Sequence, residues 1–232
     1  MSAMKVILFG ATGMVGQGVL RECLLDPDVE VVLAVGRSPL PAPLTWPGLG
    51  PEAQSKLRQL VQGDLSDLSG VETELAGFDA CFFCLGVSSA ALTEDEYRRL
   101  TFDLTLAVAE TLARLNPGMT FVYVSGAGTD STGKGRTMWA RVKGQTENAL
   151  LRLPFRAAYM FRPGVIQPLH GIVSRTRAYR IGYVLTKPVL PLLRLAFPQF
   201  LTTTEQMGRA MLRVAREGYP RPILEARDIS RL

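Results

Sequence analysis

A glycine-rich turn at residues 10–16 constrains this chain more than any other feature. The apolar run at residues 6–9 leads directly into Gly10, Gly13 and Gly16, and an amphipathic stretch follows. An apolar run is typical of a buried parallel strand. Glycines three residues apart allow a tight turn, a close approach of the backbone to a pyrophosphate, and close packing of the next helix. The order strand, glycine turn, helix therefore predicts a dinucleotide-binding site, with an ordinary tight turn as the alternative.

Short apolar runs alternate with longer helical stretches along the rest of the chain. Further strands are expected at residues 29–35, 78–85, 120–125 and 157–161, with a short one ending near residue 62, and helices at 16–25, 93–116, 138–151 and from Thr203 or Thr204 onward. This alternation is typical of βαβ units. It predicts an α/β fold, a Rossmann-type doubly wound parallel sheet in three αβα layers with a small C-terminal cap.

The size and composition of the chain suit one domain. Its 232 residues are 47% hydrophobic, which is enough to bury one full core. We expect a single domain over residues 1–232, with residues 167–201 as a cap or lid on the substrate side. No N-terminal stretch combines a basic start, a long apolar run and a small-residue cleavage site, so a cytoplasmic protein is expected.

Few side chains are suited to bind a metal ion. The chain holds three cysteines and a single histidine, His170. Cys81 and Cys84 lie three residues apart in an expected strand and therefore point to opposite faces, so we interpret them as packing residues. His170, close to Pro168 and Gly171, is interpreted as a loop residue, and no metal site is expected.

The net charge of +5 is distributed unevenly. Residues 1–150 hold 12 basic and 17 acidic side chains, whereas residues 151–232 hold 14 and 4, and no acidic residue lies between Glu147 and Glu205. The second part favours an anionic small-molecule substrate, a phosphate-bearing cofactor or an anionic membrane surface, with a basic solvated face as the alternative. No nucleic-acid-binding motif accompanies the charge, so nucleic acid is not an expected partner.

The most apolar stretch of the basic part is residues 181–200. Three prolines together with Lys187 and Arg194 interrupt it, which argues against a membrane-spanning helix. We interpret it as a lid over a substrate cleft or as a contact in a homo-oligomer. A peripheral contact of region 167–201 with a membrane surface or a protein is the alternative.

Several segments together resemble the short-chain dehydrogenase/reductase superfamily, in its atypical and extended, epimerase-like branches. These segments are Gly10-Ala-Thr-Gly-Met-Val-Gly16, Gly36-Arg37, Gly63-Asp64-Leu65, Cys84-Leu-Gly86, Tyr123-Val-Ser125, Lys143 and Arg162-Pro163-Gly164. The resemblance covers residues 4 to about 166. It implies that a nicotinamide cofactor binds at Gly10, Thr12, Gly13, Met14, Val15, Gly16, Arg37, Asp64, Leu65, Gly86, Val87, Lys143 and Pro163.

The residue after the second expected strand indicates which nicotinamide cofactor binds. Folds that bind NAD usually carry Asp or Glu there for the ribose hydroxyls, whereas this chain has Arg37. A guanidinium favours the additional 2′-phosphate of NADP, so NADP is the expected cofactor. A surface arginine at the start of a loop is the alternative. Asp64, which the resemblance places at the adenine amino group, also suits a plain turn.

The reactive end departs from the superfamily's pattern. Its chemistry depends on Ser, Tyr and Lys, with the last two spaced Tyr-x-x-x-Lys on one helix face. The resemblance places Ser125 and Lys143 there, but Trp139 stands at the tyrosine position, and an indole only donates hydrogen bonds. Three alternatives stay open. Another group supplies the proton, with Tyr97 and Ser125 as candidates and Tyr123 as a weaker one; the hydride chemistry needs none from the protein; or NADP binds without turnover.

The sequence therefore predicts an NADP-dependent oxidoreductase or epimerase-like enzyme acting on a small molecule, with Ser125, Lys143 and Tyr97 as its candidate catalytic residues. The alternative is a non-catalytic NADP-binding sensor or regulatory protein, since Trp139 replaces the tyrosine.

Overall fold

The computed structural model describes residues 3–173 and 201–232 of the chain. The segment 181–200, interpreted above as a lid, a homo-oligomer contact or a membrane-surface patch, lies outside the described residues, as does most of the predicted cap at 167–201. Within the described ranges, no helix has the length and apolar character needed to cross a membrane.

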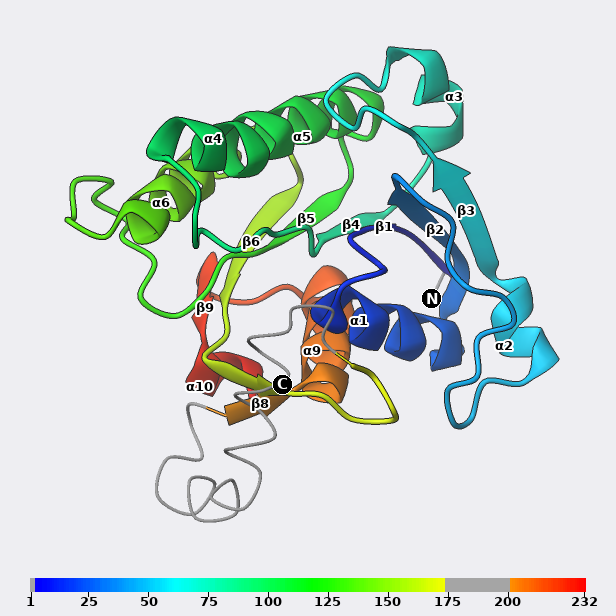
Figure 1. Ribbon diagram of the computed structural model, residues 1–232. Coiled ribbons are helices and arrows are strands. Elements are labelled where there is room, and N and C mark those ends of the chain that lie inside the picture. The colour runs from blue at the N-terminus through cyan, green and yellow to red at the C-terminus, as the bar shows by residue number, and fades with distance from the viewer. Residues whose placement is uncertain (1–2, 174–200) are drawn as a thin grey trace.

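The described residues form a central sheet of seven parallel strands (Figure 1). In hydrogen-bonding order these are β3 (Leu57–Val61), β2 (Val29–Gly36), β1 (Met4–Phe9), β4 (Ala80–Phe83), β5 (Thr120–Val124), β6 (Ala157–Arg162) and β9 (Ile223–Glu225). The chain runs outward from β1 to β3 and then crosses to β4 on the other side of β1. The strand order reverses at that point, and doubly wound sheets bind their ligands in the crevice there.

Helices cover both faces of the sheet (Figure 1). One face carries α1 (Met14–Leu25), α2 (Pro51–Ser55), α9 (Thr204–Glu217) and α10 (Ala226–Ile229). The other carries the 3₁₀ turn η1 (Ser69–Val71), α3 (Glu72–Leu75), α4 (Glu94–Arg98), η2 (Arg99–Asp103), α5 (Leu104–Leu115) and α6 (Met138–Leu150). Strand β1 supplies Val6 and Leu8 to one buried core and Ile7 and Phe9 to the other, because successive strand residues alternate between faces. The three-layer Rossmann-type fold predicted above is confirmed.

The helix predicted at 93–116 is divided into three parts. Thr93 caps α4 through a capping box with Glu96, and the first turn of α4 is acidic. The segment η2 is a π-helical turn, and α5 follows it directly. Thr101 lies within η2, buried, and its hydroxyl has no hydrogen-bond partner among the described residues. Such π-turns are typically single-turn interruptions of longer helices.

Three short strands, β7 (Val165–Gln167), β8 (Leu201–Thr203) and β9, were missed by the sequence patterns. A second sheet pairs β7 with β8, in parallel.

The cysteines follow the prediction: Cys81 lies in the core beneath α5, whereas Cys84 packs against the core beneath α1. Burial raises the pKa of both thiols, which suits packing residues.

Candidate functional site

The glycine turn after β1 is packed too closely for side chains. Gly10 has a left-handed φ of +84°, and a β-carbon there would lie 2.7 Å from the carbonyl carbon of Cys84. A β-carbon on Gly16 would lie 2.0 Å from the carbonyl oxygen of Gly10. The glycines therefore seat the start of α1 directly against the carboxyl ends of β1 and β4.

The N-terminal end of α1 is open to an anion. Its N-cap is Gly13, which has no side chain to accept from the first N–H groups, and its first turn holds no acidic residue. Backbone N–H groups at a helix start, with the positive end of the helix dipole, attract phosphate. Thr12, Met14 and Val15, all predicted cofactor residues, lie at this helix start.

A cleft opens beside the turn, at the carboxyl ends of β1 and β2. Residues that line it include Gly10, Thr12, Arg37, Ser38 and Leu65. Arg37 and Ser38 are exposed, and the described part of the chain places no carboxylate within ion-pair distance of Arg37. A larger hollow of about 340 Å³, at the amino end of β6, is lined by none of the predicted site residues. The structure thus brings four of the predicted cofactor residues to one cleft.

Four further predicted cofactor residues, Asp64, Gly86, Val87 and Pro163, lie in loops that follow the strands. Asp64 accepts hydrogen bonds from the backbone N–H of Ser66 at 2.9 Å and its hydroxyl at 2.6 Å, which lowers the pKa of the Asp64 carboxyl. This is the plain turn given above as the alternative, and a contact with adenine stays a prediction. Gly86 has open space where a β-carbon would stand, and Val87 is exposed. Pro163 accepts a hydrogen bond from the N–H of Ala127.

Lys143 projects from α6 toward the carboxyl end of β5. Its ammonium donates to the carbonyl oxygens of Ser125 and Val124 and lies 5.9 Å from the centre of the Tyr123 ring. Burial lowers the pKa of Lys143 to about 8, and the negative charge of Glu147 acts in the opposite sense. At the predicted reactive end, the structure thus holds an amine whose pKa lies well below the ordinary value for lysine.

The hydroxyl of Ser125 donates to a buried carboxylate. It lies 2.5 Å from Oε1 of Glu147 and 3.1 Å from the carbonyl oxygen of Phe161. Glu147 is fully buried and also accepts from two nitrogens of Arg162, one of them Nε at 3.0 Å. Sequence reasoning missed Glu147. Its signal was a lone acid one turn after Lys143 on a helix that packs against the sheet. The catalytic role of Ser125 stays a prediction.

Arg162 is held by acceptors on three segments. Besides Glu147 it donates to Glu225 at 3.2 Å and to the hydroxyl of Ser131 at 2.6 Å. The hydrogen bonds and charge of Glu147 raise the pKa of Arg162. Its charge is therefore balanced within the protein, so Arg162 contributes little attraction to an anionic substrate.

The aromatic residues of this region lie at different depths. Tyr97 and Tyr123 are each 1% exposed. Burial is the main cause that raises the pKa of Tyr123, and the neighbouring Tyr97 raises it further. A buried phenol with a raised pKa keeps its proton, so Tyr123 is poorly suited to proton transfer. Tyr97 lies in the core, and its catalytic role stays a prediction. Trp139 is half-buried in the first turn of α6, and its ring borders Gly128 in the loop after β5.

A parallel sheet with a glycine turn, an uncapped helix start and a cleft at its switch point defines a dinucleotide-binding domain of the Rossmann class. The model of the NAD dependent epimerase/dehydratase family matches residues 6–148. The chain belongs to this family. This match confirms the resemblance to the atypical, epimerase-like branch of the short-chain dehydrogenase/reductases. The protein is therefore of the NAD(P)-binding type.

Curated relatives support the same assignment. "Leucinostatins biosynthesis cluster protein T" of Purpureocillium lilacinum is 33% identical over 65% of this chain and 52% of that protein. "Protein FMP52, mitochondrial" of Saccharomyces cerevisiae is 30% identical over 78% of this chain and 71% of that protein. "Protein HTATIP2" of Rattus norvegicus is 29% identical over 70% and 62%. The chain thus spans about half the length of the first of these relatives.

Solved structures share the fold at low sequence identity. The reductase domain of PhqB from Penicillium fellutanum superposes with a TM-score of 0.70 at 18% identity, covering 97% of this chain and 67% of that chain. The Bordetella bronchiseptica enzyme WbmF in complex with NAD⁺ gives 0.65 at 15% identity, covering 99% and 77%. At these identities the likeness shows the fold alone.

The relatives contradict one prediction. Proteins similar to this chain in Saccharomyces cerevisiae and Emericella nidulans are named as mitochondrial, so the predicted cytoplasmic location is wrong. That prediction rested on the lack of a match between the first residues of the given sequence and a secretory signal pattern. Such a lack does not separate the cytoplasm from other compartments.

Proposed function

We propose that this protein is an NADP-dependent oxidoreductase or epimerase-like enzyme that acts on a small molecule. The observation that carries the cofactor preference is Arg37, whose exposed guanidinium follows β2 at the rim of the cleft. No carboxylate of the described residues pairs with it, so its charge is available to a ligand. A guanidinium pairs well with a phosphate, whereas an acid at the same strand end would repel the 2′-phosphate of NADP.

The residues at the switch point fit a dinucleotide. The uncapped start of α1 would hold the pyrophosphate, Arg37 and Ser38 the 2′-phosphate, and Lys143 the nicotinamide ribose. The bound cofactor supplies or accepts a hydride. The proton that accompanies it comes, in this proposal, from Lys143, because its lowered pKa lets the amine exchange a proton near neutral pH.

A binding titration tests the cofactor preference. We expect NADP to bind more tightly than NAD. Arg37→Ser should weaken NADP binding by about 10- to 100-fold, the range for a hydrogen bond to a charged group, and leave NAD binding nearly unchanged. Arg231→Ser, at another exposed arginine, is the matched control and should change neither affinity. NAD binding as tight as that of NADP in the unmodified protein would refute the preference.

A second substitution tests the role of Lys143 in proton transfer. Lys143→Arg keeps a positive charge for the ribose but cannot release its proton near neutral pH. If Lys143 supplies the proton, this variant still binds NADP and loses turnover. Unchanged turnover in Lys143→Arg would show that the proton comes from elsewhere.

A non-catalytic NADP-binding regulator is the second candidate, and Trp139 is the observation that favours it. The test follows NADPH oxidation against a panel of aldehydes, ketones and sugar nucleotides, with Trp139→Tyr and Trp139→Phe as paired variants. Turnover by the unmodified protein supports the enzyme. Tight NADP binding without turnover, and without a gain in Trp139→Tyr, supports the regulator. A gain in Trp139→Tyr alone indicates a reductase that has lost its proton donor.

A further inference from the structure

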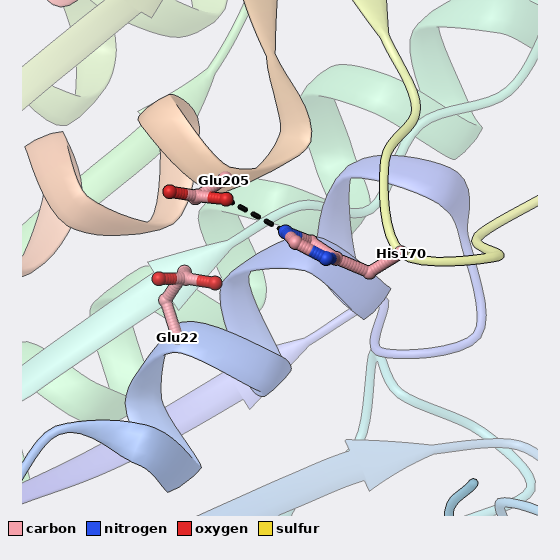
Figure 2. A group of neighbouring side chains, drawn as sticks. All are labelled: Glu22, His170 and Glu205. Carbon is pink, nitrogen blue, oxygen red and sulfur yellow. Dashed lines mark hydrogen bonds and ion pairs between the residues drawn. The ribbon is translucent and has the colours of Figure 1, made fainter. Parts of the chain in front are cut away.

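Two carboxylates and the single histidine of the chain meet outside the cofactor cleft, on the face covered by α1 and α9. Glu22 comes from the third turn of α1, Glu205 from the first turn of α9, and His170 from the turn after β7 (Figure 2). One ligand atom from each lies within 4.8 Å of those from the other two. We propose that these three side chains bind a divalent transition-metal ion, and that Zn²⁺ is the ion that fits them. This inference does not depend on the proposed function.

The donor set suits zinc. Zinc is held in proteins by imidazole nitrogen and carboxylate oxygen, and one imidazole with two carboxylates leaves a fourth position for water. Donors at about 2.1 Å from a tetrahedral ion lie about 3.4 Å apart. Because the three ligand atoms lie within 4.8 Å of one another, no separation has to close by more than about 1.4 Å. The hydrogen-bonded pair of His170 Nε2 and Glu205 Oε2, at 2.6 Å, has to open slightly. Rotations of the side chains supply such shifts without moving the helices.

The fold directs the histidine and the buried carboxylate toward each other. A β-carbon on Gly208 would lie 2.7 Å from Cβ and Cγ of Glu22, so this glycine makes the space for the Glu22 side chain between α1 and α9. His170 has a left-handed φ of +57°, and the N–H of the preceding Leu169 donates to the hydroxyl of Thr204 at 3.1 Å. That bond docks the histidine turn on the first residue of α9.

Two arginines balance the carboxylates in this structure. Arg21 is buried and pairs with Glu22. Arg209 bridges the two acids, with Nε 3.2 Å from Glu22 and Nη2 2.7 Å from Glu205. The Arg209 side chain is 64% exposed, so a metal ion can displace its guanidinium into water at little cost. With Arg209 displaced, the two carboxylates and Arg21 carry a net charge of −1, which still attracts a divalent cation.

A bound ion would join segments that are far apart in the chain. Glu22, His170 and Glu205 belong to α1, to the turn after β7 and to α9, and α1 packs directly on α9. A ligand that binds the folded state alone stabilises it in proportion to the logarithm of its concentration. Zn²⁺ is therefore expected to raise the unfolding temperature of the chain.

The single histidine makes the test direct. The full chain, with any histidine tag removed and freed of metal with a chelator, is titrated with Zn²⁺ while the ¹⁵N signals of its only histidine ring are recorded. Calorimetry on the same samples gives the stoichiometry and Kd. We expect one ion per chain, with the ring signals shifting until that ratio is reached. His170→Ala and Glu205→Gln should each weaken binding about tenfold or more.

Arg209→Ala separates a metal site from a plain ion-pair network. Removing the competing guanidinium should raise the affinity for Zn²⁺ several-fold. Glu217→Gln, at an exposed acid of the same helix that pairs with Arg213, is the matched control and should leave the affinity unchanged. Three results would overturn the proposal: no binding by Arg209→Ala, binding that leaves the ring signals of His170 unmoved, or full affinity in His170→Ala. The last two would place the ion elsewhere on the chain.

Discussion

Replacing Glu147 by glutamine tests the buried charge pair that joins α6 to β6. Its carboxylate is fully buried and accepts from the hydroxyl of Ser125 and from two nitrogens of Arg162. Glutamine keeps the shape, but it removes the charge and replaces one acceptor oxygen with an NH₂ donor. Breaking one side of a buried ion pair costs about 3–5 kcal/mol. We expect Glu147→Gln to lower the free energy of unfolding by that amount.

The matched control is Glu225→Gln. Glu225 also pairs with Arg162, at 3.2 Å, but its side chain is 51% exposed, so its loss should cost less than about 1 kcal/mol. Urea unfolding at neutral pH, followed by circular dichroism, measures both variants. Combining Glu147→Gln with Arg162→Met removes both buried charges and should recover part of the stability. Equal losses in the two single variants, or no recovery in the combined one, would refute the assignment of stability to this pair.

Two other positions, Gly16 and Lys143, test the glycine turn and the lowered pKa of the lysine. Gly16→Ala should lower stability by about 1–3 kcal/mol and weaken NADP binding, because its β-carbon would lie 2.0 Å from the carbonyl oxygen of Gly10. Gly118→Ala, with nothing within 4 Å, should leave thermal unfolding nearly unchanged. Lys143 has a pKa of about 8 in the folded chain against an ordinary value of 10.5, so the unfolded chain binds more protons between these pH values. The free energy of unfolding, relative to that of Lys143→Met, should therefore rise by up to about 3 kcal/mol between pH 8 and 10.5. Parallel curves of unfolding free energy against pH for the two proteins, measured by urea unfolding, would contradict the lowered pKa of Lys143.

Local patterns predicted the regular part of the fold. The strands at 29–36 and 120–124 differ from their predicted bounds by one residue, because a buried parallel strand is a continuous apolar run. The π-turn at Arg99–Asp103 was not predicted, since the apolar residues on either side keep a helical spacing. Strands β7, β8 and β9 have three residues each. Their pairing depends on partners far along the chain, such as Glu225 beside Arg162, and no local pattern carries that information.

The candidate site also has one part that local sequence patterns predict and one part that depends on contacts between distant segments. The glycine turn and Arg37 could be predicted because each is defined by its place next to a strand. The network of Ser125, Glu147 and Arg162 could not be predicted. Its members come from the residue after β5, from α6 and from β6, and they meet only in the folded core. His170 lies in a turn, as interpreted from the sequence, but the acids that surround it come from α1 and α9.

In the proposed function, cofactor binding and proton transfer depend on different parts of this structure. Binding rests on backbone geometry at the start of α1, which a change at Trp139 in α6 leaves intact. At the predicted reactive end, the hydroxyl of Ser125 donates to Glu147, and an indole cannot move a proton. Lys143 differs from both, because the burial that lowers its pKa makes the protonated amine a stronger acid. We therefore propose that Lys143 takes the place of the missing tyrosine as proton donor, and the Lys143→Arg variant tests this.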